Sequence, residues 1–208
     1  MDKIILDRDK KVFFIQVPRT GSTSIFDAYK IYHSNLLVDM NVSRHAEASE
    51  FKHLLKDFED YQGYAVVRNP FTQIISLYSF FIATTTFIKP NDRLKYVYDP
   101  DLIKQFIDKY VQKKHPFHTS TRQSNFVTID EKIPDNIHIF KYEDGMSRII
   151  KHMNDKYNYR LTYAYENRGF NFDRKELLAN DYFRENIVEY LKLEFELFGY
   201  SKNIKDIK

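Results

Sequence analysis

Short apolar runs alternate along this chain with longer stretches of helical periodicity. Residues 12–17 form a compact run of β-branched and aromatic side chains that ends at Pro18, a pattern typical of a buried strand. Residues 64–68 and 137–140 are two further strand candidates. Apolar residues at helical spacing predict a helix from Pro70 onward and helices over residues 24–32, 45–58, 101–111, 143–157 and 181–198. Strands that alternate with helices predict an α/β fold, a three-layer α/β/α sandwich with a central parallel sheet.

The length and composition favour one globular domain over residues 1–208. The chain has 43% hydrophobic and 16% aromatic residues and shows no internal repeat. Its 32 Lys and Arg against 29 Asp and Glu give a net charge of +3, too balanced for a protein that binds nucleic-acid backbones. The absence of cysteine excludes disulfides, cysteine-ligated metals and thiol catalysis. The start of the chain does not resemble a signal peptide, and apolar residues 74–88 are too short and interrupted to span a bilayer. We therefore expect a cytoplasmic protein with no membrane partner.

A turn rich in small and hydroxyl-bearing residues follows the first strand candidate. Its residues are Arg19, Thr20, Gly21, Ser22, Thr23 and Ser24. A turn of this kind directs several backbone N–H groups and the positive end of a helix dipole to one point, where a phosphate can bind. The alternative is an ordinary turn in which Ser and Thr cap the helix. Because the Lys and the first Gly of the triphosphate loop G-x-x-x-x-G-K-[ST] are absent, the sequence favours a P-loop-like turn for a smaller anion without a metal ion.

A second candidate for anion binding follows the second strand. Arg68 ends that strand, and Ser76 lies two turns into the helix after it. Ligands of open parallel sheets bind beyond the carboxyl ends of the strands, so we expect Arg68 and Ser76 to lie beside the Arg19 turn if the two strands are neighbours. The alternative is that Arg68 pairs with an Asp or Glu at the edge of the sheet.

These two segments, in this order, resemble two motifs of the sulfotransferases that use 3′-phosphoadenosine 5′-phosphosulfate (PAPS). Residues 18–24 resemble the 5′-phosphosulfate loop of the family, and residues 66–78 resemble its 3′-phosphate motif, in which an Arg and a Ser lie eight residues apart. The similarity is closest to the carbohydrate-type and bacterial branch, where a His and a short amphipathic helix precede the second motif. Weaker similarity extends to residues 140–143 and 194–200.

The resemblance implies a binding role for each motif. Residues 19–24 would hold the 5′-phosphate and the sulfuryl group, and Arg68 and Ser76 would hold the 3′-phosphate. Arg168, which precedes Gly169 in a late basic segment, would add a third contact to the 3′-phosphate. With the charges of two phosphates held in this way, the resemblance implies no metal ion.

Two positions depart from the family pattern. The family often has Lys where this chain has Arg19; because an arginine hardly transfers a proton, we expect Arg19 to stabilise charge instead. The family also often has Asp-Arg where this chain has Thr72 and Gln73, so any contact made by that arginine is missing here.

The acceptor hydroxyl needs a base, and a histidine is the first candidate near neutral pH. His45 stands where the family places a histidine, and we expect it to begin the helix over residues 45–58, whose positive end favours the neutral imidazole. The alternative is a surface histidine at a helix start. Asp39 and Glu47 are reserve bases, because carboxylates take this role in some members of the family.

The sequence thus predicts a sulfotransferase that moves the sulfuryl group of PAPS to an acceptor hydroxyl on a saccharide, by in-line displacement. Two alternatives stay open: a Mg-dependent, kinase-like phosphotransferase acting on a nucleotide or small molecule, and a non-catalytic nucleotide-binding module. Metal-independent binding of a 3′-phosphoadenosine nucleotide separates the prediction from the first alternative, and sulfuryl transfer separates it from the second.

Overall fold

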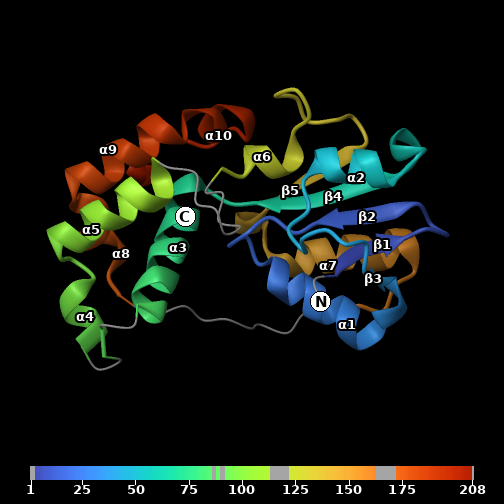
Figure 1. Ribbon diagram of the computed structural model, residues 1–208, viewed down its shortest axis with the longest axis horizontal. Coiled ribbons are helices and arrows are strands. Elements are labelled where there is room, and N and C mark those ends of the chain that lie inside the picture. The colour runs from blue at the N-terminus through green and yellow to red at the C-terminus, as the bar shows by residue number, and fades with distance from the viewer. Residues whose placement is uncertain (1–2, 86–87, 90–91, 113–121, 163–171, 208) are drawn as a thin grey trace. The chain divides into compact units, whose positions relative to one another are not determined.

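The chain divides into two compact units. In the computed structural model (Figure 1) the described residues are 3–85, 88–89, 92–112, 122–162 and 172–207. One unit comprises Met1–Arg68 and Gln123–Glu166, and the other comprises Asn69–Arg122 and Asn167–Lys208. This division does not test the prediction of a single domain over residues 1–208, which stays a prediction. Among the described helices, none has the length and apolar character needed to cross a bilayer.

A five-stranded mixed sheet forms the centre of the first unit. Its order is β3–β1–β2–β4–β5, built from β1 (Ile4–Asp7), β2 (Val12–Ile15), β3 (Leu37–Val38), β4 (Gln62–Val67) and β5 (Ile137–Lys141). Strands β2, β4 and β5 are parallel neighbours, with Ile15 paired to Ala65 and Ala65 paired to Ile139. The α/β class is confirmed, but the prediction of a parallel sheet holds only for these three strands. It is wrong for β1 and β3, because β1 folds back on β2 as a hairpin through residues 8–11 and pairs antiparallel with β3 on its other side.

Helices cover both faces of this sheet. On one face, Ile25 of α1 (Ser22–Tyr32) and Met153 of α7 (Met146–Tyr157) pack in one buried cluster with Phe14 of β2. On the other face, the ring of Phe13 stacks on Phe51 of α2 (Ala48–Leu54), with centroids 4.5 Å apart. The remaining elements of the unit are η1 (Ser34–Leu36), η2 (Phe58–Asp60), α6 (Ser124–Val127) and η5 (Tyr142–Asp144).

Helix α2 is shorter than the helix predicted over residues 45–58. It begins at Ala48 because Glu47 and Glu50 form a capping box, in which each side chain accepts the backbone N–H of the other residue. It ends at Leu54, and Phe58 lies in a separate 3₁₀ turn. The prediction that His45 begins this helix is therefore wrong, because the N-cap is Glu47 and His45 lies before it. The dipole of α2 then gives no reason for a neutral imidazole at His45, since its effect is confined to the first turn.

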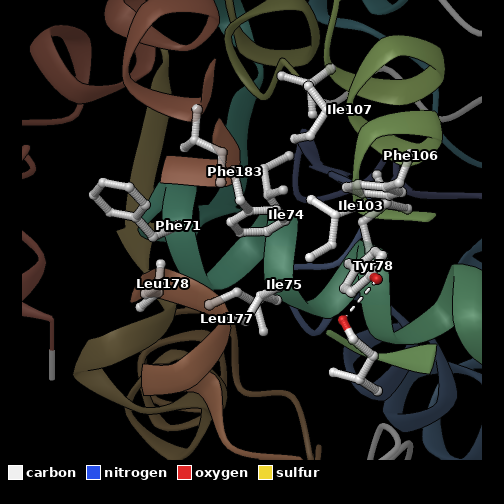
Figure 2. Close-up of a cluster of buried hydrophobic side chains, with 14 of the residues drawn as sticks. Phe71, Ile74, Ile75, Tyr78, Ile103, Phe106, Ile107, Leu177, Leu178 and Phe183 are labelled. Atoms are coloured by element: carbon white, nitrogen blue, oxygen red, sulfur yellow. Dashed lines mark hydrogen bonds between the residues drawn. The ribbon is translucent and has the colours of Figure 1, made fainter. Parts of the chain in front are cut away.

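The second unit is helical in its described part. Its core packs α3 (Pro70–Thr84) against α5 (Pro100–Phe106), α8 (Arg174–Ala179) and α9 (Asp181–Tyr190), as Figure 2 shows for Ile74, Phe106 and Phe183. Tyr78 is buried there, and its hydroxyl donates to the carbonyl oxygen of Val97 over 2.9 Å. The helix predicted over residues 101–111 is found as α5, continued by a π-helical turn (Ile107–Val111). The other elements of this unit are α4 (Arg93–Tyr96), α10 (Lys192–Leu197) and η6 (Ile204–Asp206).

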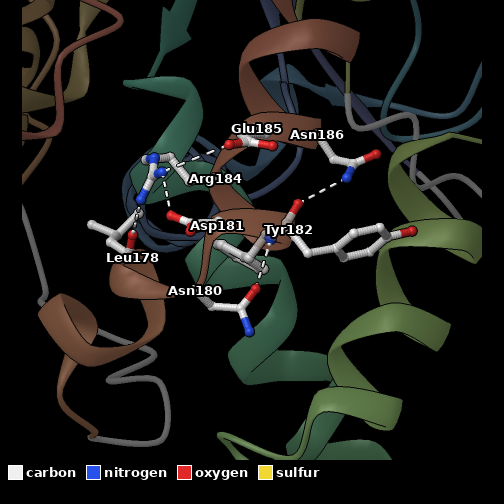
Figure 3. Close-up of polar contacts among 8 residues, drawn as sticks. Leu178, Asn180, Asp181, Tyr182, Arg184, Glu185 and Asn186 are labelled. Atoms are coloured by element: carbon white, nitrogen blue, oxygen red, sulfur yellow. Dashed lines mark hydrogen bonds and ion pairs between the residues drawn. The ribbon is translucent and has the colours of Figure 1, made fainter.

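Polar contacts define the start of α9 (Figure 3). Asn180 is the N-cap, and its side-chain oxygen accepts the backbone N–H of Phe183 over 2.9 Å. Arg184 pairs with Asp181 in the first turn. The single helix predicted over residues 181–198 is wrong in one respect: the backbone of Leu191 leaves the helical region, with φ −110°, and separates α9 from α10.

Candidate functional site

The turn between β2 and α1 has two residues with left-handed backbone. Arg19 has φ +64° and Gly21 has φ +84°. Within the turn, the hydroxyl of Thr20 donates a hydrogen bond to the carbonyl oxygen of Val17 over 2.9 Å. The hydrogen of this hydroxyl group is therefore used to stabilise the turn. A Cβ added at Gly21 would lie 3.1 Å from the ring of Tyr142 and 3.2 Å from the side chain of Met146. Both the backbone angle and the close packing therefore call for glycine at this position.

Helix α1 starts directly at this turn. Gly21 is the N-cap, and none of the described side chains caps the helix or places an acidic group in its first turn. Ser22 and Ser24 are buried in the first turn, and Thr23 is half-buried. The amides of an uncapped first turn carry the positive end of the helix dipole, which favours a negatively charged group beside them.

Arg68 lies at the carboxyl end of β4, beside this turn. The side chain of the buried Gln123 holds its backbone: the Arg68 N–H donates to Gln123 Oε1, and Gln123 Nε2 donates to the Arg68 carbonyl oxygen, each over 2.7 Å. The guanidinium Nη1 lies 3.4 Å from the carbonyl oxygen of Arg19. The guanidinium carbon lies 4.4 Å from the ring centroid of Tyr142, within the range of a cation–π contact. The end of β4 and the Gly21 turn are thus neighbours.

The guanidinium groups of Arg19 and Arg68 repel each other. Burial, and after it the positive charge of Arg68, lowers the pKa of the Arg19 guanidinium. Both groups stay protonated at neutral pH, because arginine does not deprotonate in proteins. Bringing an anion to this place would gain attraction from both charges and offset their repulsion. The turn, the helix start and the two arginines together therefore favour binding of a phosphate-like anion.

His45 contacts Gln16, which directly follows β2 and lies three residues before Arg19. Its ring Nδ1 lies 2.5 Å from the carbonyl oxygen of Gln16. A carbonyl oxygen only accepts hydrogen bonds, so Nδ1 is the donor, and in the neutral ring the lone pair is then on Nε2. The backbone N–H of His45 donates to the hydroxyl of Ser43 over 3.1 Å. The ring thus has the tautomer that a general base acting through Nε2 requires.

The two reserve bases both contact nearby backbone. The carboxylate of Glu47 accepts a backbone N–H in the capping box of α2, and Asp39 accepts the backbone N–H of Asn41 over 3.2 Å. Within the described ranges, no group of three or more His, Cys, Asp or Glu side chains is placed to hold a metal ion. Nothing in this arrangement tests the expectation of a metal-free site, which stays a prediction.

The remaining predicted binding residues are Ser76 and Arg168. Ser76 is half-buried in the second turn of α3, in the second unit, and Thr72 and Gln73 are buried on the same helix. Arg168 lies outside the described residues. The roles of Ser76 and Arg168 stay predictions.

Two residues of the site were not singled out from the sequence: Gln16 and Arg44. Gln16 carried a signal, because it is a polar residue between Ile15 and Val17 in an otherwise apolar run. Arg44 contacts the site only through the tertiary fold, so spacing along the chain could not identify it. The site as a whole combines two arginines, an uncapped helix start and a histidine at the carboxyl ends of parallel strands. Comparisons of this chain with protein-family models, with curated proteins and with solved structures found no match.

Proposed function

We propose that this chain is a sulfotransferase that moves the sulfuryl group of PAPS to a hydroxyl group of a saccharide. One observation carries the proposal: the Arg68 guanidinium lies 3.4 Å from the carbonyl oxygen of Arg19, in the turn that starts α1. Two positive side chains from separate segments then lie at the carboxyl ends of β2 and β4, the edge where open α/β sheets bind ligands. The resemblance of these two segments to the PAPS motifs supports the choice of ligand.

The donor groups fit a nucleotide with phosphates at two positions. The first-turn amides of α1 and the Arg19 guanidinium suit the oxyanions of the 5′-phosphosulfate, because both donate hydrogen bonds and carry positive potential. The Arg68 guanidinium belongs to a different strand and suits the 3′-phosphate. Its planar group is held over the Tyr142 ring, which limits the conformations it must give up on binding.

In the proposed reaction, a bond forms between the acceptor oxygen and sulfur while the bond from sulfur to the bridging phosphate oxygen breaks. The products are a sulfate ester and 3′-phosphoadenosine 5′-phosphate (PAP), and the acceptor proton passes to Nε2 of His45. Arg19 stabilises the negative charge that develops on the leaving oxygen. As in phosphoryl transfer, positioning and charge stabilisation provide most of the rate enhancement.

The finer description of the fold belongs to the same proposal. We assign a three-layer α/β/α sandwich around the sheet, with α1 and α7 forming one outer layer and α2 contributing to the other. The turn over residues 18–24 acts as the P-loop-like turn, and the chain acts as one domain in the cytoplasm.

Ligand binding tests the donor assignment. In titration calorimetry we expect PAP to bind equally well with and without Mg²⁺, and at least about tenfold more tightly than ATP, since it is held by contacts that ATP lacks. Arg68→Gln should weaken PAP binding roughly 10- to 150-fold, the effect of one charged hydrogen bond. The same variant should hardly change binding of adenosine 5′-phosphosulfate, which has no 3′-phosphate.

A matched control is Arg148→Gln, because Arg148 is exposed on α7 and, among the described residues, forms an ion pair with Asp144 across 3.7 Å. A clear preference for ATP with Mg²⁺ would contradict the proposal and favour a kinase-like phosphotransferase. An equal loss of both ligands in Arg68→Gln would contradict the role of Arg68.

Turnover tests the catalytic assignment. Radiolabelled sulfuryl transfer from PAPS to a panel of saccharides should be slowed at least about 100-fold by His45→Ala, the lower range for loss of a general base. PAP affinity should stay unchanged in that variant. Tight PAP binding without transfer to any acceptor would favour a non-catalytic binding module.

A further inference from the structure

Gln16, Arg44 and His45 form a connected network at the carboxyl end of β2. The Gln16 carbonyl oxygen accepts the hydrogen bond of His45 Nδ1. The Gln16 side-chain oxygen accepts a hydrogen bond from Arg44 Nη2 over 3.2 Å. Gln16 therefore contacts the proposed base through its backbone and the neighbouring arginine through its side chain.

The side chain of Gln16 is completely buried, and both of its polar atoms are used. Its Nε2 donates to the carbonyl oxygen of Lys3 over 3.3 Å, while Oε1 accepts from Arg44. Removing Arg44 would leave a buried amide oxygen without its hydrogen bond, which is unfavourable. The amide would then turn or shift, and the backbone of Gln16 that holds His45 would move with it.

Arg44 is held on a second side as well. Its guanidinium carbon lies 4.9 Å from the ring centroid of Phe26, in the first half of α1. Its Nε is buried and has no hydrogen-bond partner among the described residues. A buried donor without a partner costs stability, so the position of Arg44 has a cost as well as favourable contacts.

We infer that Arg44 is a positioning residue for the proposed base, acting through Gln16 to hold His45 in the tautomer with its lone pair on Nε2. The inference rests on the proposed function. Arg44 does not touch the reacting atoms in this scheme. It fixes the carbonyl oxygen to which His45 donates, and a ring that loses this acceptor also populates the Nε2–H tautomer, which cannot take a proton at Nε2.

Kinetics of single and double variants test the inference. Arg44→Gln should lower kcat roughly 10- to 100-fold, as expected for a misplaced catalytic group, and leave the KM for PAPS within about twofold. Arg44→Lys keeps a donor to Gln16 and should recover most of this loss. In the His45→Ala background, Arg44→Gln should have almost no further effect, because the group it positions is absent. Arg148→Gln again serves as the control.

Nitrogen-15 NMR of the His45 imidazole provides a readout that does not need turnover. The parent should show a protonated Nδ1 and a non-protonated Nε2, and Arg44→Gln should show a mixture of the two tautomers. A parent that has this tautomer and an Arg44-dependent change, yet transfers no sulfuryl group, would overturn the proposed function and leave the structural link from Arg44 to His45 in place.

Three results would overturn the inference itself. The first is an imidazole spectrum of Arg44→Gln that does not differ from that of the parent. The second is an equal loss of kcat from Arg44→Gln with and without His45. The third is a rise in the KM for PAPS with kcat unchanged, which would make Arg44 a ligand contact.

Discussion

Replacing Gly21 with alanine should destabilise the fold by about 1–3 kcal/mol. The backbone of Gly21 has φ +84°, and an L-residue in this left-handed region costs about 1–2 kcal/mol. The new Cβ would lie 3.1 Å from Tyr142 and 3.2 Å from Met146, so both must move by a few tenths of an ångström. Because Met146 is flexible but Tyr142 also contacts Arg68, we expect the packing part to add up to about 1 kcal/mol.

Urea denaturation of the parent, Gly21→Ala and Gly21→Asn measures this prediction and separates its two parts. Asparagine tolerates the left-handed region better than alanine but brings a Cβ to the same place. Gly21→Asn should therefore be more stable than Gly21→Ala. If Gly21→Ala matched the parent within about 0.5 kcal/mol, the limit for an ordinary surface substitution, the argument from backbone strain would be refuted.

Three further predictions concern the rest of the first unit. Gly63→Ala should destabilise by about 1–3 kcal/mol in urea, because its Cβ would lie 2.5 Å from the ring of Phe13; a variant as stable as the parent would show that this contact relaxes freely. His138 and His152 stack with centroids 5.8 Å apart, and burial above all lowers the pKa of each below 6.5. As the pH drops below 6.5, the unfolded chain therefore binds more protons than the native state, and the free energy of unfolding measured with urea should fall. This fall should be smaller when both histidines are changed to glutamine. The same dependence of the free energy of unfolding on pH in parent and double variant would contradict the prediction. Gln123→Glu should weaken PAP binding without unfolding the protein. A carboxylate can still accept the hydrogen bond from the Arg68 N–H, but it cannot donate one to the Arg68 carbonyl oxygen. An unaltered PAP affinity would show that the second hydrogen bond is not needed to position Arg68.

The sequence was sufficient to predict the helices and strands that have a clear hydrophobic pattern. The apolar run before Pro18 and the run before Arg68 were found as β2 and β4, and their parallel pairing follows from the helices between them. Strand β1 was missed because its apolar run, Ile4 to Leu6, is only three residues long and is followed by a charged turn. Its antiparallel pairing depends on that turn, which a search for periodic segments does not detect.

Helix boundaries were less predictable than helices. The apolar positions through Leu54, Leu55 and Phe58 keep a helical period, but α2 ends at Leu54. The same holds across Leu191, where apolar spacing continues through the break between α9 and α10. In both places the apolar spacing indicates which side chains face the core. Where the helix ends is determined by local capping and packing.

The candidate site likewise has a part that could be predicted from local sequence and a part that could not. The turn at Gly21 and the arginine at the end of the next strand have local signatures, and the structure brings these two segments together. Gln16 and Arg44 contact each other across 28 positions of the chain, and Arg68 and Gln123 across 55. No spacing rule connects such pairs, so these contacts could only be identified from the three-dimensional structure.

The interior position of β2 in the sheet determines when the geometry of the neighbouring turn is lost during unfolding. It is an interior strand, paired with β1 on one side and β4 on the other, and all four of its residues are buried. Segments of this kind exchange their amide hydrogens only when the molecule opens as a whole. The turn that follows β2 is therefore anchored to a strand that we expect to exchange slowly, and the first turn of α1 should keep its geometry until global unfolding.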